Sequence, residues 1–144
     1  MASSKVAAYR REEMAGKSPL ELVIQVYDGA ISAFRAAADR YRSDDAAGGR
    51  EQLERAQTFV THLYTTLDAE RGGDISAQLG RLYAYVINRI SVAAATGDPG
   101  VIDDNIAILN NLREGWIGLR AQSADPAPSG PAPAAAPGGF VGSA

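Results

Sequence analysis

The sequence predicts an all-α protein, an antiparallel four-helix bundle, from three observations. Four segments of about 20 residues repeat apolar side chains at helical spacing, breaks containing Gly, Asp or Ser separate them, and no segment alternates as a strand does. Such helices would be about 30 Å long, and short connections place consecutive helices antiparallel. The bundle is expected to span residues 18–122, between an N-terminal segment 1–17 and a C-terminal tail 123–144.

The first helix has the clearest start signal in the chain. Ser18 is placed to cap it, Pro19 suits its first position, and Glu21 falls where a capping box needs a carboxylate. Leu22 and Val26 form a second apolar ridge beside the main stripe, so this helix presents apolar surface in two directions. The main stripe comprises Leu20, Val23, Ile24, Tyr27, Ala30, Ile31, Phe34, Ala38 and Tyr41.

The second helix is expected to begin near Arg50, because the segment 43–49 interrupts the periodic pattern and ends in two glycines. Phe59 and Tyr64 flank its apolar face. The residues expected to be buried on this face are Leu53, Ala56, Val60, Leu63 and Leu67.

Glycine-containing breaks also set the limits of the third and fourth helices. Asp74, which follows Gly72 and Gly73, is expected to cap the third helix, and Asp98 and Pro99 to cap and begin the fourth. The third stripe comprises Ile75, Leu79, Leu82, Tyr83, Val86, Ile87, Ile90 and Ala94. The fourth comprises Val101, Ile102, Leu109, Leu112, Trp116 and Leu119.

Composition excludes several classes of protein. The 14 basic and 17 acidic residues of this 144-residue chain are intermixed, with a net charge of −3, so no basic stripe suits nucleic acid. The chain has no Cys and no apolar run long enough for a signal peptide or a membrane span, which favours the cytoplasm. Five of the 7 prolines lie in the tail among Ala, Gly and Ser, so we expect the tail to be disordered.

No cluster of residues indicates catalysis, a metal site or a cofactor, so the sequence predicts a protein that is not an enzyme. His62 is the only histidine, and it points away from the apolar face of its helix. Histidine-phosphotransfer domains are four-helix bundles with one exposed histidine, which makes phosphotransfer an alternative. They usually place a Lys and a Gly soon after it, whereas Leu63, Tyr64 and two threonines follow here.

The third helix carries apolar side chains outside its core stripe. Tyr85 and Val92 are seven residues apart and, with Gln78, form a second line roughly 120–140° from that stripe at about 100° per residue. A neighbouring helix could bury such a line, or the chain could use it to associate with itself as a structural oligomer. The functional interpretation is a groove that accepts apolar helical segments of a partner.

From about Tyr9 to Arg120 the sequence resembles the FliS family, the flagellar secretion chaperones for flagellin. The resemblance rests on the order and spacing of Tyr9, Met14, Ser18-Pro19, Glu21-Leu22, Tyr27-Asp28-Gly29-Ala30, Leu67-Asp68, Gly72-Gly73-Asp74-Ile75, Leu79, Leu82-Tyr83, Asp98 and Trp116. It implies a cytoplasmic chaperone that holds the disordered C-terminal region of flagellin, prevents premature polymerisation and delivers it to the type III export apparatus. The export gate is a possible second partner.

The resemblance also suggests where the client binds. In the family the N-terminal segment can cover part of the groove, which makes Tyr9 and Met14 the expected movable cover. Leu22 and Val26 are then expected to form one groove wall and the third-helix residues another, with Asn88 and Arg89 able to bond the client backbone. The third-helix wall comprises Tyr85, Asn88, Arg89 and Val92. We expect a monomer, with weak dimerisation as the alternative.

Overall fold

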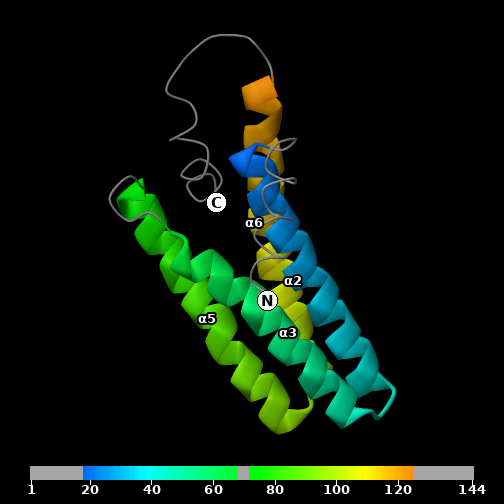
Figure 1. The fold of residues 1–144 in the computed structure, drawn as a ribbon. Helices are drawn as coiled ribbons and strands as arrows, with labels where there is room; N and C mark the ends of the chain where they lie inside the picture. The colour runs from blue at the N-terminus through cyan, green and yellow to red at the C-terminus, as the bar shows by residue number, and fades with distance from the viewer. Residues whose placement is uncertain (1–17, 68–71, 125–144) are drawn as a thin grey trace, which may run out of the picture.

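The computed structural model describes residues 18–67 and 72–124, and within these ranges it contains four helices and no strand (Figure 1). They are α2 (Pro19–Arg42), α3 (Ala46–Thr65), α5 (Asp74–Thr96) and α6 (Pro99–Ala124). The helices α2 and α5 each pack against α3 and α6, and α2 and α5 occupy opposite corners of the bundle. The predicted antiparallel four-helix bundle is therefore confirmed.

Some of the predicted segments fall outside the described residues. Tyr9 and Met14 belong to the segment 1–17, and the expected disorder concerns the tail beyond α6, so both expectations stay predictions. The helix α6 ends at Ala124, two residues beyond the expected limit of the bundle at 122.

The predicted capping box at the start of α2 is present. The Ser18 hydroxyl accepts a hydrogen bond from the Glu21 backbone N–H at 3.1 Å, and the Glu21 carboxylate accepts one from the Ser18 N–H, also at 3.1 Å. Two backbone donors that the helix itself cannot satisfy are thereby paired. At the start of α6, the Asp98 carboxylate accepts a hydrogen bond from the Gly100 N–H at 2.8 Å, as expected.

Two predicted helix starts are wrong. The helix α3 begins at Ala46, not near Arg50, because the Asp45 carboxylate caps it by accepting a hydrogen bond from the Gly48 N–H at 2.9 Å. Asp74 is not the cap of α5 but its first residue. Gly73 takes the cap position with a φ of 55°, which glycine adopts without strain, and the Asp74 carboxylate lies in the first helical turn.

Most of the predicted stripes are buried, and the centre of the core is polar as well as apolar. Tyr27 of α2 and Tyr83 of α5 lie across the diagonal of the bundle, and their hydroxyl groups share a buried hydrogen bond. Their rings meet edge to face with centroids 6.3 Å apart. Nine of the predicted stripe residues are half-buried and not fully buried: Leu20, Val23, Tyr41, Leu67, Ile75, Leu82, Ile87, Ala94 and Trp116.

Burial changes the acidity of both tyrosines. Loss of hydration raises the pKa of Tyr27 to about 12, although the hydrogen bond with Tyr83 partly opposes this. Burial also raises the pKa of Tyr83 above its usual range, and the neighbouring Tyr27 reinforces that shift. Both hydroxyls therefore stay protonated in the folded protein at neutral pH.

Alkaline pH is expected to destabilise the bundle. Because the folded-state pKa of Tyr27 exceeds that of an unfolded tyrosine, its contribution is complete below about pH 10 and is lost as the pH rises to about 12. The difference between the folded and unfolded pKa of Tyr27 corresponds to about 3 kcal/mol of folding stability. About half of this contribution is lost by about pH 11. In urea titrations, a Tyr27→Phe/Tyr83→Phe variant should lose less stability than the wild type between neutral pH and about pH 11. Equal losses would contradict this expectation.

A close approach of α2 and α3 depends on Gly29. A Cβ atom at this position would lie 2.5 Å from Cε1 of the half-buried Phe59 ring. Alanine normally stabilises a helix over glycine by about 1 kcal/mol, but Gly29→Ala should instead destabilise the protein by about 1–2 kcal/mol through this clash. Gly118→Ala is the matched control, since nothing lies within 4 Å of its Cβ. Urea unfolding should show opposite signs for the two variants, and a stabilising Gly29→Ala would refute the close-contact argument.

Candidate partner-binding site

The described residues offer no centre for metal chemistry. Among residues 18–67 and 72–124, no group of three or more His, Cys, Asp or Glu side chains could hold a metal ion. In the same ranges, no helix combines the length and the apolar character needed to cross a membrane.

The α5 strip is a set of side chains on the outer face of α5: Tyr85, Asn88, Arg89 and Val92. Spacings of three, four and seven residues place them on one side of a helix. Tyr85 and Val92 are 49% and 40% exposed, respectively, so the second apolar line predicted from the sequence is not covered by a neighbouring helix. The third-helix residues expected to contact a partner are brought together on one surface.

Arg89 connects the α5 strip to α6. Its guanidinium lies 3.6 Å from the Asp104 carboxylate, and its central carbon lies 5.8 Å from the centre of the Tyr85 ring. The Arg89 side chain is only 28% exposed, and its buried Nε atom has no hydrogen-bond partner among the described residues. The ion pair and the cation–π contact together restrict the orientation of Tyr85. Asp104 was not predicted, because its role depends on the register between α5 and α6.

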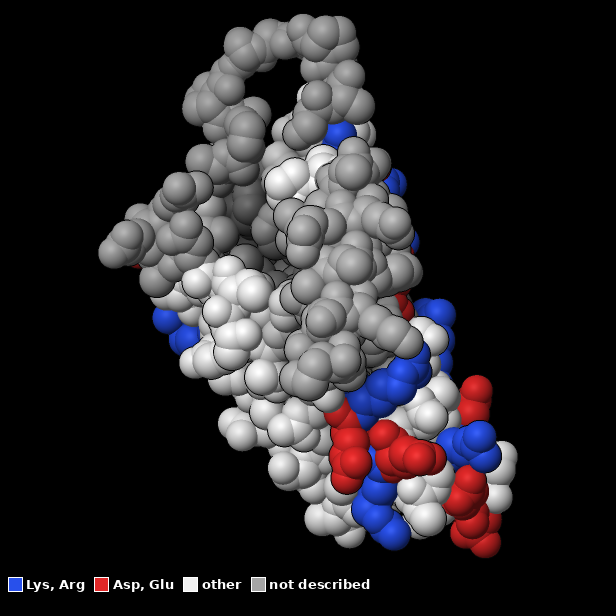
Figure 2. Space-filling model, in the orientation of Figure 1, with Lys and Arg blue, Asp and Glu red and all other residues white. Residues whose placement is uncertain are grey.

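The helix α5 carries few charged residues, and the charge beside the α5 strip comes from the pair of Arg89 with Asp104 of α6. Asp74, Arg81 and Arg89 are the charged residues of α5. In the view of Figure 2, charged side chains gather where α2 ends and α3 begins, whereas the visible C-terminal half of α5 is almost uncharged. Exposed aromatic and aliphatic side chains on a surface poor in charge are typical of a protein-binding region.

The other expected groove wall lies elsewhere. Leu22 and Val26 are half-buried on α2, and Val26 packs against the core. Helical spacing places them on the same side of α2 as Gly29, which contacts Phe59 of α3. Because α2 and α5 are at opposite corners of the bundle, the structure does not bring Leu22 and Val26 together with the α5 strip.

The comparison with protein families agrees with the fold. The model of the family described as "Flagellar protein FliS" matches residues 1–123. The chain belongs to the FliS family. The resemblance predicted from the sequence is thus confirmed.

Individual FliS proteins are similar over most of their length. The flagellar secretion chaperone FliS of Salmonella typhimurium is 33% identical over 100 residues, which cover 69% of this chain and 74% of that protein. The Bacillus subtilis protein of the same name is 28% identical over 109 residues, which cover 76% and 80%, respectively. A crystal structure of a bacterial flagellar chaperone matches with a TM-score of 0.68 at 22% identity and covers 84% of this chain and 99% of its own, which supports the fold.

Membership of the FliS family bears on the expected absence of catalysis. The relatives are named as secretion chaperones, which is not an enzymatic role, and the prediction that this FliS family member is not an enzyme is confirmed at that level. His62 is exposed on α3, as predicted, and its side chain makes no hydrogen bond or ion pair with the described residues. Among residues 18–67 and 72–124, no side chain is paired with this histidine in the way that would prepare it for phosphotransfer.

Proposed function

We propose that this protein is a cytoplasmic export chaperone that binds the disordered C-terminal region of flagellin, prevents its premature polymerisation and delivers it to the flagellar type III export apparatus. Membership of a family of flagellar secretion chaperones supports this proposal. The observation that carries it is the α5 strip, where Tyr85 and Val92 remain exposed on a helix with few charges. A disordered client gains affinity by folding its apolar side chains onto such a surface.

The positions of the other expected residues suggest how the client is arranged. Leu22 and Val26 lie on a different face from the α5 strip, so a client that uses both must pass around the bundle. An initially disordered segment can do this, because it adopts its bound path only on binding. Tyr9 and Met14 are proposed to cover part of this path before the client arrives. We propose a monomeric chaperone, with the export gate as the partner that receives the client.

Calorimetric titration with the C-terminal region of flagellin from the same source tests this function. We expect saturable 1:1 binding with a large negative heat-capacity change, because apolar surface is buried as the client folds. Absence of heat at several temperatures would refute the flagellin proposal. Light scattering at several protein concentrations tests the self-association alternative. Self-association predicts that the measured molar mass rises with protein concentration in the absence of client.

The α5 strip is tested by replacing Tyr85 and Val92 with Asp. Because both side chains are exposed, the variant should retain its helicity while its affinity for the client falls by at least about a hundredfold, the effect of losing two interface anchors of about 1.5–3 kcal/mol each. Tyr64→Asp is the matched control, since Tyr64 of α3 is 46% exposed and lies outside the strip. Undiminished binding by the Tyr85→Asp/Val92→Asp variant would remove the strip from the site. His62→Gln should bind normally, whereas phosphotransfer would require His62.

A further inference from the structure

The α5 strip presents two large apolar side chains on one helix. Among residues 18–67 and 72–124, the exposed large apolar side chains are Tyr64, Tyr85 and Val92. Tyr64 lies on α3, whereas Tyr85 and Val92 lie about 10.5 Å apart along α5, at about 1.5 Å per residue. This spacing leaves room for one aromatic side chain between them. The strip can therefore hold an aromatic residue that comes from another segment.

The C-terminal tail contains such a residue. Phe140 and Val141 are the only large apolar residues in 123–144, and Asp125 is the only charged one. The strip end of α5 is also poor in charge, because no charged residue follows Arg89 on this helix. The segment 1–17, by contrast, carries charged side chains of both signs. An uncharged apolar pair matches this surface, because few hydrated charges lose water when the two meet.

The distance from the end of α6 to the strip follows from the register of two helices. The ion pair of Arg89 with Asp104 places these residues at the same level, and α6 continues from Asp104 to Ala124, about 30 Å further. Tyr85 precedes Arg89 by about 6 Å in the same direction, because α5 and α6 are antiparallel. The last residue of α6 is thus about 24 Å along the bundle from Tyr85.

The tail is long enough to bring Phe140 to this point. Phe140 follows Ala124 by 16 residues. A disordered chain of this length, as the composition predicts, has ends about 20–24 Å apart on average, and in polyproline form it reaches about 50 Å. Because the average length matches the span to Tyr85, the effective concentration of Phe140 at the strip is near its maximum, in the millimolar range. Even a weak contact is then occupied within one chain.

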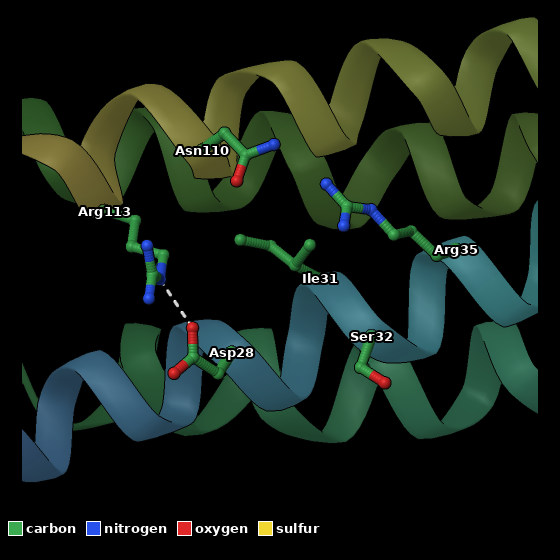
Figure 3. Close-up of a pocket in the computed structure, with 6 residues that line it drawn as sticks. All are labelled: Asp28, Ile31, Ser32, Arg35, Asn110 and Arg113. Carbon is green, nitrogen blue, oxygen red and sulfur yellow. Dashed lines mark hydrogen bonds and ion pairs between the residues drawn. The ribbon is translucent and has the colours of Figure 1, made fainter.

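The hollow between α2 and α6 is a poorer site for an apolar segment. It has a volume of about 460 Å³ and is lined by Asp28, Ile31, Ser32, Arg35, Asn110 and Arg113 (Figure 3). Ile31 is the one apolar residue of this lining and is only 6% exposed, and an ion pair of Asp28 with Arg113 crosses the hollow. The polar side chains there would lose water without gaining a partner from Phe140. This hollow therefore serves as the control surface.

We propose that in the absence of client the C-terminal tail folds back onto the α5 strip, with Phe140 between Tyr85 and Val92. The match to the family model ends at residue 123, so this contact involves a segment outside the matched part and goes beyond the proposed function. Only its consequence for client binding rests on that function. The tail and the client would occupy the same side chains, so each excludes the other.

A disulfide between the tail and α5 tests the contact without client. The chain has no Cys, so Gly142→Cys and Asn88→Cys introduce one pair of thiols, the first next to Val141 and the second on the α5 strip. Phe140 on the strip would hold the two thiols close together. The disulfide should therefore form faster than the tether alone allows.

Gly142→Cys with Ser32→Cys is the matched control. Ser32 shares the α2–α6 hollow with Asn110, which precedes Ala124 by about 21 Å along α6. The tether therefore reaches Ser32 at least as readily as Asn88, and both positions are exposed. The Asn88 pair should form its disulfide at least about tenfold faster than the Ser32 pair. Equal rates would overturn the proposal.

Removal of the apolar side chains from the tail provides a second comparison. Added to the Asn88 pair, Phe140→Ser/Val141→Ser should reduce the rate to that of the Ser32 pair, whereas Ala134→Ser/Ala135→Ser should leave it unchanged. A rate that does not respond to Phe140→Ser/Val141→Ser would refute the contact. Disulfides that join two chains, at a rate that rises with protein concentration, would identify a second copy as the occupant and also refute it.

Competition with the client gives the functional measurement. A strip that the tail covers for about two thirds to nine tenths of the time binds client about threefold to tenfold more weakly. Phe140→Ser/Val141→Ser should therefore bind the flagellin C-terminal region about threefold to tenfold more tightly than the wild type. Unchanged affinity with equal disulfide rates would reject the tail contact and retain the flagellin function. Fast disulfide formation in the Asn88 pair, with no binding of flagellin by the wild type, would retain the contact and reject that function.

Discussion

The contact between Tyr27 and Tyr83 is the constraint on which the positions of the surface residues of α2 and α5 depend. Each ring points to the centre of the bundle, so each fixes the rotation of its own helix about its axis. With Tyr83 inward, a residue two positions later lies about 200° around the helix, which places Tyr85 on the outside. With Tyr27 inward, its neighbours Val26 and Asp28 point to opposite sides, toward α3 and α6. A hydrogen bond between two buried hydroxyls is more selective than apolar packing, because any other rotation leaves a buried polar group unpaired.

Polar contacts also fix how α5 and α6 lie beside each other, and this pair of helices packs less extensively than α2 and α3. The Asn105 side chain is buried and donates a hydrogen bond to the Val86 carbonyl at 3.1 Å. The Arg89–Asp104 ion pair lies one turn away on the exposed side of the same two helices. In Figure 1, α5 diverges from α6 toward its own N-terminus, so these polar contacts hold the helices where they are close. The α5 strip thus lies on a helix whose position along α6 is set by directional bonds.

The sequence alone predicts what depends on local chemistry and helical period. The capping box at Ser18 and Glu21, the cap at Asp98 and the outward position of Tyr85 and Val92 all follow from spacing within one helix. The start of α3 was missed because Gly48 and Gly49 resemble a break. The structure shows that Gly49 instead gives space to the Tyr41 ring, which would lie 2.6 Å from an added Cβ.

Contacts between residues of different helices could not be predicted from the sequence. Arg89 meets Asp104, and Arg35 lies opposite Asn110, only because of the order of the helices around the bundle and the register between them. Neither quantity is encoded in a local pattern. A position such as Arg35 has the sequence features of an ordinary solvated arginine, and its place opposite Asn110 becomes visible only when α2 and α6 are placed side by side.

Two proposed contacts on different faces of the bundle, the α5 strip and the apolar ridge of Leu22 and Val26 on α2, would suit a chaperone that must both hold and release its client. When two weak contacts are joined by a flexible segment, the second forms at an effective concentration in the millimolar range, so the pair is much tighter than either contact alone. Neither contact then has to be strong. A receptor that removes the client from one surface also removes this linkage, and the remaining contact dissociates at the rate of a weak complex. Tight retention and rapid transfer are compatible on this basis, and the ion pairs of Asp103 and Asp104, which face α2 and α5 respectively, keep the two surfaces at a fixed separation.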